Sequence, residues 1–161
     1  MEIIVRKATP ADAGVIADFN LALAWETEHL RLEADRVRAG VKALLAEPAR
    51  GTYYIAEAVS HSGAREIAGQ LLITYEWSDW RNGNFWWVQS VYVANAARKT
   101  GVFRTLFEHV RSEARSREDV CGLRLYVDGN NTKAFQAYER MGMTLTNYQI
   151  FEMDFVLRSH K

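Results

Sequence analysis

Cysteine is nearly absent from this chain of 161 residues, which contains only Cys121, and proline occurs just twice. A single cysteine forms no disulfide within the chain, so a hydrophobic core must hold the fold, as in proteins of reducing compartments. No apolar run approaches the roughly 18 residues that a membrane-spanning helix requires, and the first residues lack the apolar segment of a signal peptide. We therefore expect a cytoplasmic protein that does not enter a membrane.

An excess of charge of one sign is missing too, because 20 lysines and arginines balance 20 aspartates and glutamates. Proteins that bind nucleic acid or anionic membranes usually carry surplus positive charge. Residues 98–117 hold several arginines, which leave a nucleic-acid-binding module as a minor alternative. Acidic residues alternate with those arginines, however, and this mixture is typical of a solvated helix face. We expect neither a nucleic-acid partner nor a membrane partner.

What the chain does contain is enough apolar sequence for one core, since 48% of its residues are hydrophobic and 25% are charged. This length and composition, without repeats or linker-like segments, predict a single domain over residues 1–161. Periodicity and cap residues predict helices over residues 9–28 and 33–46. Strand patterns cover residues 3–7, 52–59, 67–77 and, as the expected last two strands, 144–156.

A hydrophobic strand over residues 85–93 leads into a turn that contains Gly101 and then into an amphipathic helix. From Val102 onward, apolar residues recur every four positions, as one buried helix face requires. A glycine turn before a helix offers unpaired backbone N–H groups and the positive end of the helix dipole, both of which suit a phosphate. Positive side chains are added by Arg98, Lys99 and Arg104. An ordinary connection with a solvated basic rim has the same composition, and the turn matches neither a Walker loop nor a dinucleotide fingerprint.

A second strand, turn and helix follow this one. Residues 123–127 alternate as a strand, and the sequence Asp128-Gly129-Asn130-Asn131 supplies turn and helix-cap chemistry. Ala134 and Tyr138 share one face of the next helix, which Gly142 ends.

With these residues the chain resembles the GNAT superfamily of N-acetyltransferases. The family's motif for the pyrophosphate of coenzyme A is Arg/Gln-x-x-Gly-x-Gly/Ala, and it is matched by Arg98 and Gly101, with Phe103 replacing the last small residue. The later motif is Asn-x-x-Ala-x-x-x-Tyr with a closing Gly-Phe, and the residues at its positions are Asn131, Ala134, Tyr138, Gly142 and Met143. Residues 5–12 resemble the family's opening strand and helix cap, so the resemblance covers nearly the whole chain.

The resemblance implies a mixed α/β (α+β) fold, with a mostly antiparallel mixed sheet of about six to seven strands flanked by about four helices. It also implies acetyl-CoA as the co-substrate and direct attack of a primary amine on the thioester, without an acyl-enzyme. The residues that it assigns to the coenzyme are Val91, Tyr92, Val93, Arg98, Lys99, Thr100, Gly101, Val102, Phe103, Arg104, Asn131, Ala134 and Tyr138. No metal is expected.

Acyl transfer to an amine needs an acid for the departing thiolate and a base for the attacking amine. Tyr138 is the best candidate acid, because a phenol shares a proton with sulfur, although the ring could simply pack in the core. The base stays open, since the central strand carries Gln89 and Ser90 where many relatives have a carboxylate, and these two could hold a water. Carboxylates that could act through such a water are Glu26, Glu28, Glu76 and Asp79. Cys121 is a weaker candidate nucleophile, because no histidine is placed to activate it.

Aromatic and acidic residues form the predicted acceptor side. They lie at the end of the first helix and before the central strand, and they are Trp25, Glu26, Glu28, Glu76, Trp77 and Asp79. Rings beside carboxylates suit a cationic amine, and the arrangement is similar to that of polyamine and diamine acetyltransferases. The tryptophans could instead pack an interface between two copies, and a homodimer is expected.

The main alternative from another class is a degenerate family member that holds coenzyme A, or a partner protein, without turnover. Phe103 and the strand without a carboxylate favour this alternative. The motif residues Arg98, Gly101, Asn131 and Tyr138 oppose it.

Overall fold

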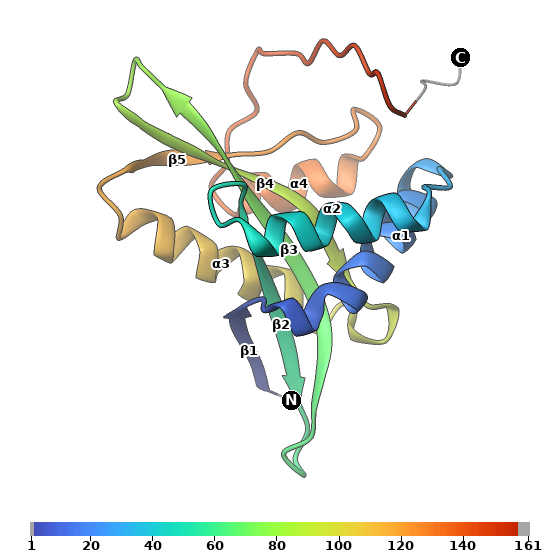
Figure 1. The fold of residues 1–161 in the computed structure, drawn as a ribbon. Helices are drawn as coiled ribbons and strands as arrows, with labels where there is room; N and C mark the ends of the chain where they lie inside the picture. The colour runs from blue at the N-terminus through green and yellow to red at the C-terminus, as the bar shows by residue number, and fades with distance from the viewer. Residues whose placement is uncertain (1, 158–161) are drawn as a thin grey trace. The chain divides into compact units, whose positions relative to one another are not determined.

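The computed structural model describes residues 2–157, and the chain forms two compact units, Met1–Leu125 and Tyr126–Lys161. The first unit contains a single sheet with the strand order β1-β2-β3-β4-β5 (Figure 1). Its strands are β1 (Glu2–Lys7), β2 (Thr52–Val59), β3 (Arg65–Ser78), β4 (Gly83–Val93) and β5 (Val120–Arg124). Neighbours are antiparallel from β1 to β4, and β5 runs parallel to β4.

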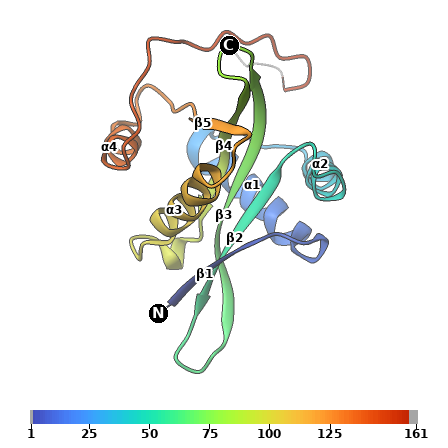
Figure 2. The ribbon, with the colours of Figure 1, turned by 90° about the vertical axis from the view of Figure 1, so that its left-hand side faces the viewer.

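Helices cover both faces of this sheet. Figure 2 shows α3 (Val102–Arg115) on one face, with α1 (Ala13–Glu28) and α2 (Ala34–Ala46) on the other. Strand alternation explains this arrangement, because successive side chains of β2 point to opposite faces. Tyr53 and Ile55 pack with Ile16 of α1, whereas the Tyr54 ring lies 5.7 Å from that of His109 on α3.

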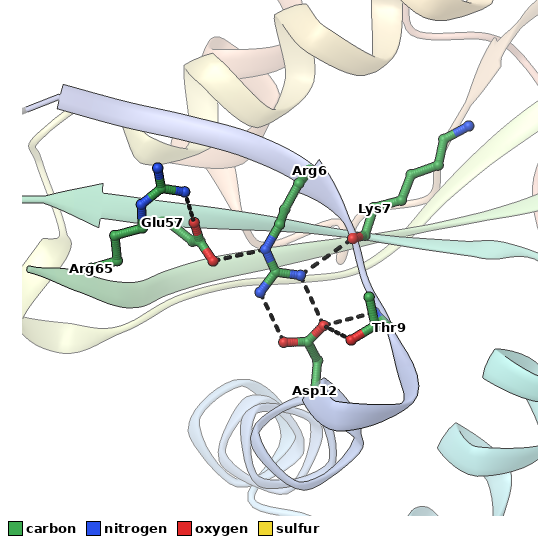
Figure 3. A network of polar contacts seen from close by, with 6 residues as sticks. All are labelled: Arg6, Lys7, Thr9, Asp12, Glu57 and Arg65. Carbon is green, nitrogen blue, oxygen red and sulfur yellow. Dashed lines mark hydrogen bonds and ion pairs between the residues drawn. The ribbon is translucent and has the colours of Figure 1, made fainter.

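A charged network fastens the first strand to the rest of the sheet (Figure 3). The Arg6 guanidinium of β1 donates two hydrogen bonds of 2.9 Å to the Asp12 carboxylate and one of 2.7 Å to Glu57 of β2. Arg65 of β3 donates a further bond to Glu57. Asp12 also accepts from the backbone N–H of Thr9, which fixes the entry into α1. Two buried carboxylates are thereby paired, as buried charges must be.

The predicted elements of the first unit are largely present. The helix expected over residues 9–28 begins as a short 3-10 turn, η1 (Pro10–Asp12), before α1, and the strands over residues 52–59 and 67–77 appear as β2 and β3. The strand expected over residues 123–127 lies earlier, as β5, and ends at Arg124. The expected mixed α/β fold with about four helices is confirmed.

The second unit contains one helix, α4 (Thr132–Arg140), and the expectation of two final strands over residues 144–156 is wrong. The sheet therefore has five strands among residues 2–157 rather than six to seven. Local hydrogen bonds give a physical reason: Thr146 accepts from the backbone N–H of Tyr148, and Asp154 accepts from those of Val156 and Leu157. Such turns compete with the ladder bonds that a strand requires.

Candidate active site

The central strand β4 carries a bulge next to the predicted catalytic residues. Gln70 of β3 pairs with Tyr92 and Leu72 pairs with Gln89, so Leu71 alone faces the two residues Ser90 and Val91. Ser90 adopts a left-handed φ of 49°, which is costly for any residue with a side chain. Bulges of this kind frequently lie beside active sites, where they redirect the backbone.

A buried polar network holds the bulge in place. The Gln70 side chain is 0% exposed, and its Nε2 donates to the Ser90 carbonyl at 3.2 Å and to Asn20 Oδ1 at 2.8 Å. Asn20, on α1, in turn donates to the Tyr53 hydroxyl at 3.1 Å. Sequence reasoning missed all three residues. The signal available was a polar residue, Gln70, within the otherwise apolar run of β3.

Beyond the bulge, one edge of β4 lacks a neighbouring strand. The parallel pairing with β5 covers only Asn84–Trp87 of β4, whereas the pairing with β3 continues to Val93. Among the described residues, the sheet therefore leaves the β5-side edge of β4 unpaired from Val88 to Val93. An unpaired strand edge presents backbone N–H and C=O groups to any extended chain with amide groups.

This open edge leads directly into the predicted phosphate turn. After β4, the chain passes through η2 (Asn95–Ala97) to Gly101, which has a φ of 92° and forms the cap of α3. Lys99 is also left-handed, with a φ of 66°. Thr100 donates from its hydroxyl to the Ala97 carbonyl and closes the turn. The first amides of α3 thus follow a compact turn, as an anion site at a helix N-terminus requires.

Phe103, which replaces a small residue of the family motif, packs along α3. Its ring lies 6.0 Å from that of Phe107, which is buried beneath the helix together with Val102. The partly buried ring of Phe103 thus lies beside the packed side of α3.

The Arg98 side chain is bound to α1 and to the end of β4. Its Nη2 lies 2.5 Å from Glu26 Oε2, its Nε donates to the Val93 carbonyl, and its guanidinium lies 5.5 Å from the centre of the Tyr92 ring. The Tyr92 hydroxyl donates to the other Glu26 oxygen at 2.8 Å. Bonds from Arg98 and then Tyr92 lower the pKa of the Glu26 carboxyl. Arg98, which is predicted to bind the coenzyme, is thus bound to Glu26, which is predicted to bind the amine.

Around Gln89, polar side chains share the sheet face that α1 and α2 cover. The Gln89 amide donates to the Thr74 hydroxyl. Glu76 accepts from the Trp87 ring N–H at 2.9 Å and from Arg124 at 2.6 Å, so its carboxylate is fixed by two donors. This sheet face thus carries an amide next to the bulge, a hydroxyl, and an ion-paired carboxylate nearer the start of β4.

The structure does not bring all predicted acceptor residues together. Trp25, Glu26 and Glu28 lie in the last two turns of α1, where Glu26 touches Tyr92 near the end of β4. Trp77 and Asp79 adjoin the turn that starts β4 at Gly83. Gly83 and Tyr92 are nine positions apart, which corresponds to about 30 Å of extended strand. One small amine cannot contact both groups.

The second unit contains the other half of the family motif. Asn131 accepts the backbone N–H of Ala134 at 3.1 Å, which confirms its predicted role as the cap of α4. Gly142, with a φ of 87°, ends the helix as predicted, since the N–H of Met143 bonds back to the Tyr138 carbonyl. Tyr138 is half-buried, and burial raises the pKa of its hydroxyl. The phenol is therefore protonated at neutral pH, as an acid must be.

A separate cavity of about 250 Å³ lies against α3 on the opposite sheet face. It is lined by Lys7, Thr52, Tyr54, Tyr75, Asn84, Trp86, Glu113, Arg117 and Asp119. Glu113 binds Lys7 at 2.9 Å and the Tyr54 hydroxyl at 2.9 Å, and Arg117 binds Asp119. The charged groups satisfy one another, so this cavity carries no sign of a ligand.

Comparisons with known proteins agree with this geometry. A family model for the acetyltransferase (GNAT) family matches residues 17–143. The structure of a possible acetyltransferase from Clostridium difficile 630 is 38% identical with a TM-score of 0.86, over 97% of this chain and 99% of that one. No curated protein sequence matches the chain.

Two more distant structures share the fold. Glucosamine-6-phosphate N-acetyltransferase from Arabidopsis thaliana is 18% identical with a TM-score of 0.68, over 95% of this chain and 99% of that one. A predicted acetyltransferase with acetyl-CoA from Clostridium acetobutylicum is 15% identical with a TM-score of 0.73, over 99% and 100% of the two chains. Within residues 2–157, no helix is long and apolar enough to cross a membrane.

Proposed function

Because the chain belongs to the GNAT family of acetyltransferases, we propose that it transfers the acetyl group of acetyl-CoA to a primary amine. The amine nitrogen attacks the thioester carbon directly, the carbon–sulfur bond breaks, and coenzyme A leaves as the thiol. One observation carries the proposal: the open edge of β4 continues through the left-handed Gly101 to the first amides of α3. An extended amide chain that ends in a pyrophosphate fits such a path.

The coenzyme would bind mainly through backbone groups. Amides of its extended arm would pair with Val91, Tyr92 and Val93 on the unpaired edge, in the manner of an added strand. Its pyrophosphate would receive N–H groups from the turn and from the start of α3, where the helix dipole favours negative charge. The proposed residues of this part are Arg98, Lys99, Thr100, Gly101, Val102, Phe103 and Arg104.

Proton transfer is assigned to three side chains. Tyr138 would share its proton with the departing sulfur, because a phenol is protonated at neutral pH and can donate a hydrogen bond to a developing thiolate. Gln89 and Ser90 would hold the water through which the amine loses its proton. Asn131 and Ala134 belong to the same motif as Tyr138, and we assign all three residues to the binding of the coenzyme.

The proposed acceptor is a small cationic amine, such as a polyamine, a diamine or an amino-acid-like amine. Two separate groups of residues are proposed as alternatives to attract it, since one small amine does not contact both: Trp25, Glu26 and Glu28 on α1, or Glu76, Trp77 and Asp79 on β3 and its turn. Glu76 shares the sheet face of Gln89, which favours it among the carboxylates as the acceptor of a relayed proton.

The direct experiment is to mix the protein with acetyl-CoA and a panel of polyamines, diamino acids, aminoglycosides and peptides, and to follow free thiol release. We expect release that depends on the amine. Tight coenzyme binding without thiol release for any amine would favour the degenerate coenzyme-binding alternative, which the missing strand carboxylate supports.

A matched pair of glycine variants tests the phosphate turn itself. Gly101→Val should weaken coenzyme A binding by at least about tenfold, because a branched side chain at a φ of 92° strains the turn. Gly63→Val is the control, since Gly63 has a similar φ of 83° and an equally open surrounding in the hairpin between β2 and β3. Titration calorimetry would measure both, and equal affinities for the two variants would remove the phosphate assignment.

A further inference from the structure

We propose that Glu26 is an internal competitor for the arginine of the phosphate turn, so that binding of a pyrophosphate to Arg98 releases the end of α1. This inference rests on the proposed function, because it needs Arg98 to meet the coenzyme. Glu26 would then regulate the binding of the coenzyme, in addition to its proposed contact with the amine.

The contacts at Arg98 define the competition. Its guanidinium is occupied on one side by the Glu26 carboxylate at 2.5 Å and on another by the Val93 carbonyl at 3.1 Å. A pyrophosphate binds arginine best through two parallel N–H groups. The Nη2 group that faces Glu26 must be given up before such a bidentate contact forms.

Glu26 occupies an unfavourable position for a negative charge. It lies in the last turn of α1, where the helix dipole repels anions, and the helix ends at His29, which has a left-handed φ of 52°. No basic residue of α1 itself lies in that turn. The carboxylate is therefore stabilised by Arg98 and Tyr92 from outside the helix, and loss of Arg98 leaves only the bond from Tyr92.

Release of Glu26 reaches the proposed acceptor residues. Trp25 precedes Glu26, its ring lies 5.5 Å from that of His29, and Arg31 lies 5.0 Å from its centre. When Arg98 turns to a pyrophosphate, the Glu26 carboxylate loses its cation at the helix end that also carries Trp25, and it becomes a partner for a cationic amine. Coenzyme and amine binding are then coupled positively, and such coupling is reciprocal.

Affinity measurements on two isosteric variants test the proposal. Glu26→Gln keeps an acceptor for the Tyr92 hydroxyl but removes the charge, and the exposed pair leads us to expect about two- to fivefold tighter binding of coenzyme A. Asp18→Asn removes the same charge from an exposed position of the same helix and should bind like the wild type. Titration calorimetry at low and high salt would measure the affinity of each variant for coenzyme A. The difference in affinity between Glu26→Gln and the wild type should shrink at high salt.

A second probe separates the phosphates from the rest of the coenzyme. S-acetylpantetheine lacks the pyrophosphate, so Glu26→Gln should not bind it more tightly than Asp18→Asn does. An equal gain with this probe would overturn the proposal, as would equal or weaker coenzyme A binding by Glu26→Gln. Each of these results leaves the proposed function standing, whereas a wild-type chain that binds no coenzyme A removes both.

Discussion

At the scale of single residues, the Tyr138 hydroxyl offers the sharpest test of the chemistry. Tyr138→Phe should lower kcat by about a hundredfold while the KM for acetyl-CoA stays within about twofold, because only the proton donor is lost. Steady-state thiol release measures both constants. Tyr148→Phe, at an exposed tyrosine of the same unit, is the control and should be silent. An unchanged kcat in Tyr138→Phe would remove the acid role.

Residues whose roles are local were predictable from the sequence. Asn131 as a cap, Gly142 as a helix end and Gly101 as a left-handed turn follow from neighbouring residues and backbone sterics. The pairing of Arg98 with Glu26 joins positions 72 apart in the sequence. No local pattern signals such a contact, because it depends on how α1 lies across the end of β4.

At the scale of elements, the Arg6–Asp12 pair fastens β1 to the start of α1. The Arg6 guanidinium lowers the pKa of Asp12 to about 2, from an ordinary value of 3.8. Asp12→Asn should therefore lower the free energy of unfolding by about 2 kcal/mol at pH 7. Urea unfolding monitored by circular dichroism measures this loss.

The pH dependence of that loss has a definite sign. Because the pKa is lower in the folded chain, the stabilisation is complete well above pH 3.8 and is lost as the pH falls towards about 2. The wild type and Asp12→Asn should thus converge in acid. Asp18→Asn, at an exposed aspartate of α1, is the control and should follow the wild type throughout. A constant gap across this pH range would contradict the ion-pair explanation.

The bulge of β4 gives a second prediction at this scale. Gln70→Leu keeps the volume of the side chain but removes the donor to the Ser90 carbonyl and Asn20 Oδ1, and the loss of these two part-buried hydrogen bonds should cost about 1–3 kcal/mol of stability. We also expect kcat to fall, since Gln70 positions the strand that carries Gln89 and Ser90. Thermal unfolding and thiol-release kinetics would be compared, and full activity in a destabilised variant would show that the network serves the fold alone.

Strand patterns predicted most of the sheet but failed at the C-terminal stretch. Residues 52–59 and 67–77 are rich in strand formers, and each has a partner strand close in the sequence, so pattern and pairing agree. Residues 144–156 are also rich in strand formers, but a strand exists only with a partner, and Thr146 and Asp154 bind the local backbone instead. Composition alone does not distinguish these cases.

At the scale of the whole molecule, two tryptophans suggest how copies of the chain meet. Trp77 and Trp80, at the turn between β3 and β4, are 59% and 85% exposed. Exposed aromatic residues three positions apart are typical of interaction surfaces, and we propose that Trp80 joins two copies into a homodimer, while Trp77 keeps its proposed contact with the amine. Trp80→Ser should then shift the mass found by sedimentation from dimer to monomer, whereas Trp25→Ser should not. A monomeric wild type at micromolar concentration would contradict this.

The bulge at Ser90 also divides β4 into two parts, each of which pairs regularly with β3. Gln89 and Tyr92 are three residues apart, yet they point to the same face because Ser90 and Val91 share one partner. Removing one of these two residues would restore regular pairing while Gln70 still faced Tyr92 and Leu72 still faced Gln89. A single inserted residue thus changes the backbone at one point and leaves every flanking side chain on its face. The backbone at the candidate site can therefore differ from a regular strand while the pairing and the facing of the other β3 and β4 residues stay the same.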